Sequence, residues 1–344
     1  MSPTGGPVPA GFEPASFTAV GDSDYWLLGS VPCRTGRCSA ILRTTDGGSS
    51  FAGIPAPRLT AAGADAAAAA TPTLRFADRL DGFAFITGAG GVFYATHDGG
   101  ATWRRLALGA VLAFATGGGN AYAVTARCSP QRCTAYRFER SQTSADVWRG
   151  AAVPFAPDSP VLDLAAHGSN VWLLGTLAAQ SSSGKDELAL STDGGGTFVT
   201  RPGPCVPGLG GALAPTSATV VWAVCPTGMS AGAWRSIDGG ATFTRLTTPP
   251  LVNSAALAPA SQDTAVLARN GVGSQLLRTT DAGATWSSPS TPGAATYVPW
   301  IGFTDADVGA ALVQTGYDAS AKIAHQSLWR TTDGGATWST VRIR

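Results

Sequence analysis

The sequence predicts an all-β fold, a seven-bladed β-propeller with four antiparallel strands in each blade. Three observations support it. A short turn motif recurs along the chain, its copies lie 43 to 52 residues apart, and glycine and proline mark many short segments rather than one long stretch. The motif reads Ser/Thr-x-Asp-x-Gly-x-Thr/Ser-Trp/Phe. Its aspartates are Asp46, Asp98, Asp193, Asp238, Asp281 and Asp333.

One copy of the motif is degenerate. The gap from Asp98 to Asp193 is twice the usual spacing, and the segment 140–148 between them aligns without gaps on 235–243, with Thr143 in the aspartate position. The seven units that result each have room for four strands and their turns. Because Thr143 lacks a carboxylate, we expect this turn to be less rigid than the others.

The repeats divide the chain into one domain of seven blades behind an N-terminal extension, residues 1–12. We number the strands of a blade A to D from the axis outward. In the fifth blade we expect them at 211–214, 219–225, 232–236 and 241–246. The blades are expected near residues 13–54, 73–107, 108–153, 160–203, 209–248, 252–289 and 296–344.

The chemistry of the motif favours a structural role. Asp-Gly-Gly is a tight-turn signal, because glycine reaches positive φ without steric cost. The carboxylate can accept hydrogen bonds from N–H groups of its own turn, and the neighbouring hydroxyls can add more. The final aromatic side chain is expected to return into the apolar layer between sheets. We therefore interpret these aspartates as turn stabilisers rather than as paired catalytic acids.

The strand order separates two faces of the propeller. The A–B and C–D turns, which include the motifs, share one face, here called the turn face. The B–C loops and the D–A links share the other, here called the loop face. We expect ligands on the loop face, where lengths and composition vary most. The segment 61–70 in one D–A link is compatible with either a short helix or a mobile flap.

Six cysteines favour disulfides over a metal site. Two pairs share the same four-residue spacing, and the remaining two form a third pair, whereas zinc sites use tighter spacing or nearby histidines. We expect no metal and an oxidising compartment. The first residues lack the basic end and apolar stretch of a signal peptide, so we expect a secreted or cell-surface protein whose leader is absent from this sequence. The expected bridges are Cys33–Cys38, Cys128–Cys133 and Cys205–Cys225.

Composition excludes several classes. Only 13% of residues are charged, the net charge is +1, and no run of like charge occurs, so a nucleic-acid partner is not expected. No window of about 18 apolar residues occurs, so we expect no transmembrane helix. The hydrophobic fraction of 44% is ample for a large core.

The repeats resemble the Asp-box, or BNR, repeat family of β-propellers. The segments before two motifs, 76–85 and 302–309, are similar to those of secreted bacterial members, including sialidase-like proteins. The resemblance is specific for fold and weak for activity, because the family includes sialidases, other glycosidases, sortilin-type receptors and photosystem assembly factors. An intracellular assembly factor is disfavoured by the cysteines. We expect no cofactor.

The resemblance also allows a test for sialidase chemistry. Sialidases need an arginine triad, a tyrosine nucleophile with a glutamate partner, an acid/base aspartate and, usually, an Arg-Ile-Pro segment before the first motif. This sequence has no Arg-Ile-Pro and only three glutamates, Glu13, Glu139 and Glu187. Glu139 adjoins the degenerate turn, far from the axis. We therefore expect no sialidase activity.

Candidate ligand-binding residues come from the expected loops and inner strands. Four arginines lie on the two small cysteine-closed loops and could bind an acidic ligand. Arg75 and Trp300 lie on inner strands near the axis. The longest loops add acidic and aromatic side chains. The candidates are Arg34, Arg37, Arg75, Arg127, Arg132, Asp186, Glu187, Trp300, Tyr317 and Asp318.

Two functions remain open at this point. The first is an extracellular binding or scaffold propeller, a monomer whose glycan, small-molecule or protein partner contacts the loop face. The second is a glycoside hydrolase or other carbohydrate-active enzyme of the Asp-box propeller type, but not a typical sialidase. A two-carboxylate glycosidase would need opposing acids roughly 5 to 10 Å apart. The small number of candidate acids and the presence of cross-linked loops favour the first function, a binding or scaffold propeller.

Overall fold

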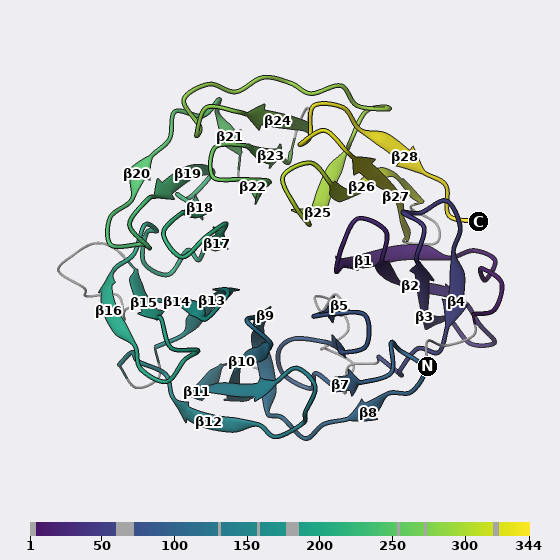
Figure 1. Cartoon of the computed structure of the whole chain (residues 1–344), viewed down its shortest axis with the longest axis horizontal. Helices are drawn as coiled ribbons and strands as arrows, with labels where there is room; N and C mark the ends of the chain where they lie inside the picture. Colours follow the sequence, from purple (N-terminus) through teal and green to yellow (C-terminus); the bar gives the residue numbers. More distant parts are fainter. Residues whose placement is uncertain are drawn as a thin grey trace.

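The computed structural model describes residues 5–59, 72–129, 132–156, 159–176, 186–252, 255–271, 274–318 and 323–344. Its strands form seven antiparallel sheets that follow one another around a ring (Figure 1). Within these ranges the chain contains strands and no helix. The predicted all-β, seven-bladed propeller is confirmed.

Each blade is built from strands that are consecutive in the sequence. Blade 1 holds β1 (Glu13–Ala19), β2 (Tyr25–Pro32), β3 (Arg37–Thr44) and β4 (Ala52–Ile54). Blade 2 holds β5 (Thr73–Phe76), β6 (Gly82–Phe85), β7 (Phe93–Thr96) and β8 (Arg104–Arg105). Blade 3 holds β9 (Ala110–Gly117), β10 (Asn120–Cys128), β11 (Cys133–Gln142) and β12 (Arg149–Ala152). Blade 4 holds β13 (Val161–His167), β14 (Asn170–Gly175), β15 (Glu187–Ser191) and β16 (Val199–Pro202).

The last three blades follow the same order with small changes. Blade 5 holds β17 (Ala212–Pro215), β18 (Val221–Pro226), β19 (Ser230–Ser236) and β20 (Thr244–Arg245), and the extra strand β21 (Leu251–Val252) also pairs with β19. Blade 6 holds β22 (Ala255–Pro259), β23 (Ala265–Arg269) and β24 (Gln275–Thr279), and an isolated bridge between Arg278 and Ser287 stands where its outer strand was expected. Blade 7 holds β25 (Tyr297–Phe303), β26 (Gly309–Asp318), β27 (Ile323–Thr331) and β28 (Ser339–Val341).

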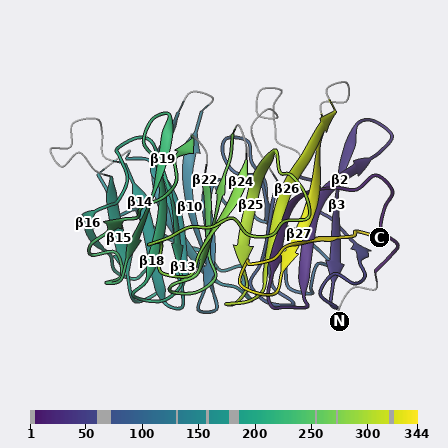
Figure 2. The same cartoon turned by 90° about the horizontal axis from the view of Figure 1, so that it is seen from above.

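The turns confirm the expected division into two faces. In blade 5 the Gly239 N–H of the C–D turn donates to the Thr219 carbonyl of the A–B turn at 2.7 Å. Six blades make this bond from the residue after the aspartate, and blade 3 makes a related bond from Thr143, so the C–D turns and the A–B turns lie together on the turn face. Figure 2 shows the ring from the side, with the strands running between the two faces. The other six bonds join Gly47 to Ser23, Gly99 to Leu80, Thr143 to Gly119, Gly194 to Ser169, Ala282 to Asp263 and Gly334 to Asp307.

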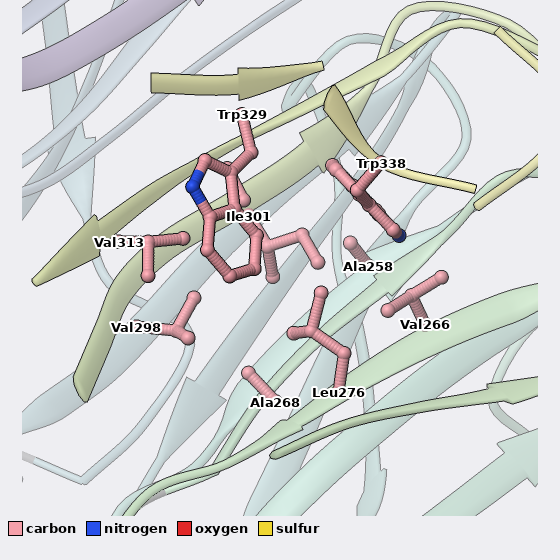
Figure 3. Close-up of a cluster of buried hydrophobic side chains, with 10 residues drawn as sticks. Ala258, Val266, Ala268, Leu276, Val298, Ile301, Val313, Trp329 and Trp338 are labelled. Carbon is pink, nitrogen blue, oxygen red and sulfur yellow. The ribbon is translucent and has the colours of Figure 1, made fainter. Parts of the chain in front are cut away.

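The core consists of apolar layers between adjacent sheets. Between blades 6 and 7, Trp329 and Trp338 pack against Ile301 and Val266, all buried (Figure 3). Between blades 1 and 2, Trp26 stacks on Phe76 with ring centroids 3.9 Å apart. These tryptophans therefore serve packing, and burial of their rings helps to hold neighbouring blades together.

Polar side chains of one blade also bind the inner strand of the next, two from inner strands and one, Asn270, from the residue after β23. The Ser16 hydroxyl accepts the Leu74 N–H, the Asp163 carboxylate accepts the Leu213 N–H at 2.6 Å, and the Asn270 side-chain oxygen accepts the Val298 N–H. The inner edge of a propeller sheet leaves backbone N–H groups without a strand partner, and these side chains satisfy some of them.

The ring closes between blades 7 and 1. The Arg330 guanidinium donates to the Asp22 carbonyl at 3.0 Å, and buried Phe17 and Leu328 belong to one apolar cluster across the junction. The N-terminal extension adds to the outer edge of blade 1, where Gly6 and Gly53 exchange two backbone hydrogen bonds.

All six cysteines pair as predicted, in bridges Cys33–Cys38, Cys128–Cys133 and Cys205–Cys225. Three disulfides are typical of a protein that folds in an oxidising compartment. None of the described elements is a helix long and apolar enough to cross a membrane. The segment 61–70 lies outside the described residues.

Candidate functional site

The six Asp boxes share one hydrogen-bonding pattern. In blade 5 the Asp238 carboxylate accepts the Thr242 N–H at 2.9 Å, the Thr242 hydroxyl at 2.7 Å and the Ser236 hydroxyl at 2.7 Å. The Thr242 bonds, with that from Ser236, lower the pKa of Asp238 to about 2. A carboxylate saturated by its own turn suits fold maintenance rather than proton transfer. The same bonds recur at Asp46, Asp98, Asp193, Asp281 and Asp333.

The degenerate box of blade 3 has a different turn. Thr143 donates to the Gly119 carbonyl, while the Ser141 hydroxyl donates to the Ala145 carbonyl and accepts the Val147 N–H. In the other boxes the N–H at the position of Val147, such as that of Thr242, donates to the aspartate. Blade 3 therefore keeps a C–D turn but lacks a carboxylate at this position.

A cavity at the junction of blades 7 and 1 brings together two of the predicted site residues, Arg75 and Trp300. Its volume is about 70 Å³, and its aromatic wall includes Phe17 and Phe303. Phe17 and Trp300 pack with ring centroids 4.9 Å apart. Arg75 belongs to β5 of blade 2, whereas the other lining residues belong to blades 1 and 7, so its side chain extends across the inner edge of blade 1.

Arg75 is a cation of this cavity to which the described residues supply no acidic partner. It is half-buried, and it makes no hydrogen bond or ion pair with any residue that the structure describes. Desolvation by the surrounding protein lowers the pKa of Arg75, although a guanidinium stays charged in proteins. An unpaired, partly desolvated guanidinium beside aromatic rings is suited to bind an anion that brings its own charge.

The outer end of the cavity carries acidic groups. Asp22 lines it, and the carboxyl groups of Asp22 and Asp305 lie within hydrogen-bonding reach of each other. That contact raises the pKa of Asp22. Burial raises the pKa of Asp305, but hydrogen bonds from the Val308 and Asp307 N–H groups act against it, and the pKa of Asp305 is lowered overall. This contact is closer than the roughly 5 to 10 Å between opposing acids of glycosidases.

The cavity lies toward the turn face. Its lining includes Gly21 and Thr304, which belong to the A–B turns of blades 1 and 7. The sequence did not identify Phe17, Phe303 or the Asp22–Asp305 contact as part of a site. The alternation of apolar and polar side chains along inner strands could have suggested the two phenylalanines. The contact between Asp22 and Asp305 has no such signal, because the two turns are almost 300 residues apart.

The loop-face arginines divide into two separate groups. Arg34 and Arg37 lie on blade 1 and Arg127 and Arg132 on blade 3, so blade 2 separates them. Arg37 is bound to Ser30 and to the Gly11 carbonyl, whereas Arg34 and Arg127 are exposed.

The acidic candidates on the loop face are not grouped into a site. Asp186 is fully buried, and burial raises its pKa, although its carboxylate accepts the Gly208 N–H at 3.3 Å. Glu187 is half-buried in β15. Tyr317 and Asp318 belong to β26, and their side chains lie outside the described part of the structure.

Large apolar side chains are exposed on the loop face of blade 5. Met229, in the B–C loop, is 87% exposed, and Val206 and Leu209, in the preceding D–A link, are each 43% exposed. The Cys205–Cys225 bridge fixes this link to β18. Grouped, exposed apolar side chains on anchored loops are typical of surfaces that contact a partner.

Comparison with known proteins supports the fold and gives a partial family match. The family model described as Sortilin, neurotensin receptor 3 (Sortilin-Vps10) matches residues 231–344, the outer part of blade 5 and blades 6 and 7. A search of curated proteins gives no match.

Solved structures resemble the whole ring. YCF48 bound to a D1 peptide has a TM-score of 0.57 and 15% identity, over 95% of this chain and 95% of that one. YCF48 from Cyanidioschyzon merolae has a TM-score of 0.58 and 16% identity, over 96% and 98%. A puromycin-hydrolyzing peptidase from Mycobacterium tuberculosis has a TM-score of 0.62 and 13% identity, over 98% of this chain and 57% of that one. These likenesses show a shared propeller fold.

Proposed function

We propose that this chain is a secreted or cell-surface binding propeller of the Asp-box type, without sialidase activity, whose partner is a peptide or protein. The observation that carries the proposal is the Arg75 guanidinium, which faces an aromatic cavity near the axis without an acidic partner among the described residues. A rigid ring with one unpaired cation in a lined cavity is suited to binding rather than to bond cleavage.

The cavity favours a carboxylate as the bound group. Its volume of about 70 Å³ accepts a small group rather than a whole sugar ring. A guanidinium can bind a carboxylate through two parallel hydrogen bonds. Phe17 and Trp300 supply apolar contact for the carbon atoms that carry it. An acidic side chain or the C-terminus of a peptide has both a carboxylate and adjoining apolar carbon atoms.

The comparisons support a peptide or protein partner. One of the similar propellers, YCF48, has a solved structure in which it is bound to a D1 peptide, and the matched family model carries the name of a receptor. Both likenesses concern fold, so the peptide class is our proposal for this chain. The three disulfides support placement outside the cytoplasm.

The loop face remains a second proposed contact surface, separate from the cavity and open to a further contact with a partner. Met229 and Leu209 offer exposed apolar area there, and the exposed arginines Arg34 and Arg127 offer charge. The cavity and the loop face are separate surfaces, so a single set of variants can distinguish their contributions.

The test is affinity selection from a pool of random hexapeptides with free C-termini, with an amidated pool in parallel. We expect the immobilised protein to enrich peptides that carry a free terminal carboxylate or an acidic side chain. Arg75→Gln should abolish this enrichment because it removes the cation while preserving polarity. Arg245→Ser, a change at an exposed position on blade 5, is the matched control. Met229→Asp tests the loop face.

Three outcomes would count against the proposal. Equal enrichment by Arg75→Gln and the intact protein would exclude the cavity as the anchor. Loss of enrichment in Met229→Asp alone would assign binding to the loop face. Hydrolysis of a fluorogenic sialoside by the purified chain would contradict the exclusion of sialidase activity.

A further inference from the structure

Blade 3 departs from the other blades at its Asp box, and a depression on the turn face lies at this place. The depression has a volume of about 520 Å³ and lies between blades 3 and 4. Arg140 and Arg149 line it, together with the amide side chains of Asn120 and Gln142. It is far larger than the cavity at Arg75 and shares no lining residue with it.

The two arginines are paired on the two outer strands of the blade. Arg140 on β11 is directly opposite Arg149 on β12. Like charges directly opposite each other destabilise a sheet. Four other blades also carry an arginine immediately before the box, and each pairs it with a small uncharged residue. These pairs are Arg43 with Ala52, Arg235 with Thr244, Arg278 with Ser287 and Arg330 with Ser339.

Neighbouring acids do not neutralise this pair. Arg140 donates to the Gly194 carbonyl at 3.0 Å, and Arg149 is exposed without a hydrogen bond or ion pair to any described residue. Asp193 also lines the depression, but its oxygens accept bonds from its own turn, and it forms no ion pair with either arginine within the described chain.

The nearest carboxylate of the same turn is also occupied. Asp146 pairs with Arg104 of blade 2, and the His97 Nε2 lies 3.3 Å from its Oδ1. Thr143 replaces the box aspartate. Blade 3 therefore lacks the box carboxylate, its other turn carboxylate is paired with blade 2, and Arg149 adds a positive charge beside the depression.

We propose that this depression binds a sugar that carries a sulfate or phosphate group. The paired guanidiniums are suited to an oxyanion with several acceptor oxygens, which would offset their mutual repulsion. The amides of Asn120 and Gln142 offer donors and acceptors for the hydroxyl groups of a sugar ring. The site is distinct from the peptide cavity and does not depend on it.

Isothermal titration with glucose 6-phosphate and glucose 6-sulfate tests the proposal, with glucose and inorganic phosphate as references. Arg149→Ser gives blade 3 the residue that blade 7 has at this position. We expect it to weaken binding of both charged sugars about tenfold or more, because it removes a charge-assisted contact. Arg245→Ser on blade 5 should leave binding unchanged. Without ligand, Arg149→Ser should melt at the same or a higher temperature, which separates lost binding from lost folding.

Several results would overturn the inference. Binding that Arg149→Ser does not weaken would place the ligand elsewhere. Inorganic phosphate binding as tightly as glucose 6-phosphate would show an anion site without sugar recognition. No heat of binding for either charged sugar at millimolar concentration would exclude the site. Arg75→Gln should have no effect here, so failure of this proposal is distinguishable from failure of the peptide proposal.

Discussion

Residue by residue, the Asp box is a small hydrogen-bonding unit whose parts have separate tasks. The aspartate binds the N–H and hydroxyl four positions later, and the preceding Ser or Thr hydroxyl accepts the glycine N–H two positions after the aspartate, as in Gly240 to Ser236. The residue after the aspartate has positive φ, +72° at Gly239. This division of tasks predicts different consequences for different substitutions.

Asp238→Ala should lower the stability of the protein by about 1 kcal/mol, because hydrogen bonds from exposed donors are partly replaced by water. Asp238→Asn is the matched control and should lose less, since one acceptor oxygen remains. Urea denaturation measures both. A variant that kept the wild-type midpoint while losing peptide enrichment would contradict the structural role of the boxes.

Ala282→Gly should stabilise the protein by about 1 kcal/mol, because Ala282 has φ of 59° where the other intact boxes have glycine. The reverse change, Gly239→Ala, should destabilise blade 5, where the added Cβ would also meet the Ala218 carbonyl oxygen at 3.1 Å. Thermal melting of the two variants should move in opposite directions. A shift of both in the same direction would refute the strain argument.

At the level of strands and blades, polar side chains tie the inner strands of neighbouring sheets together. Asp163 is the charged member of this group. It lies in β13, whose other residues are apolar except His167, and burial raises its pKa to about 6, opposed by the Leu213 and Leu164 N–H bonds. Asp163 is not among the candidates from the sequence, although a single carboxyl group in a largely apolar strand is an available signal.

Because the pKa of Asp163 is raised on folding, its protonated form favours the folded state. That contribution is complete below the ordinary value near 4 and is lost as the pH rises through about 6. Asp163→Asn keeps an acceptor for the Leu213 N–H and removes the charge. It should stabilise the protein by about 3 kcal/mol at pH 8 and have little effect at pH 4. Denaturant midpoints across this range measure the difference, and a constant difference would contradict the assignment.

The elements that the sequence predicted well are those with local signals. The turn motifs specify the blade count, the strand order specifies the two faces, and equal cysteine spacing indicated two of the bridges. Elements that depend on distant partners were not predicted. The pairing of Gly6 with Gly53 and the reach of Arg75 across blade 1 both depend on how distant segments meet. The Arg278–Ser287 bridge that replaces the outer strand of blade 6 is local, and the sequence did not predict it either.

For the whole molecule, ring closure determines where a ligand could be held. Blades 1 and 7 come from opposite ends of the described chain and meet without sharing a sheet (Figure 1). The cavity lies at this junction, where Phe17 and Trp300 line it, and Arg75 reaches it from blade 2. Apolar packing and the Arg330 contact to Asp22 hold the junction together. The site therefore depends on three blades being in place.

The most direct test of this account is a crystal structure of the protein with a peptide enriched from the random pool. The account predicts a carboxylate of the peptide within about 3 Å of the Arg75 guanidinium, which is hydrogen-bonding distance, with adjoining carbon atoms against Trp300. A peptide bound elsewhere on the ring, with no carboxylate at Arg75, would contradict it.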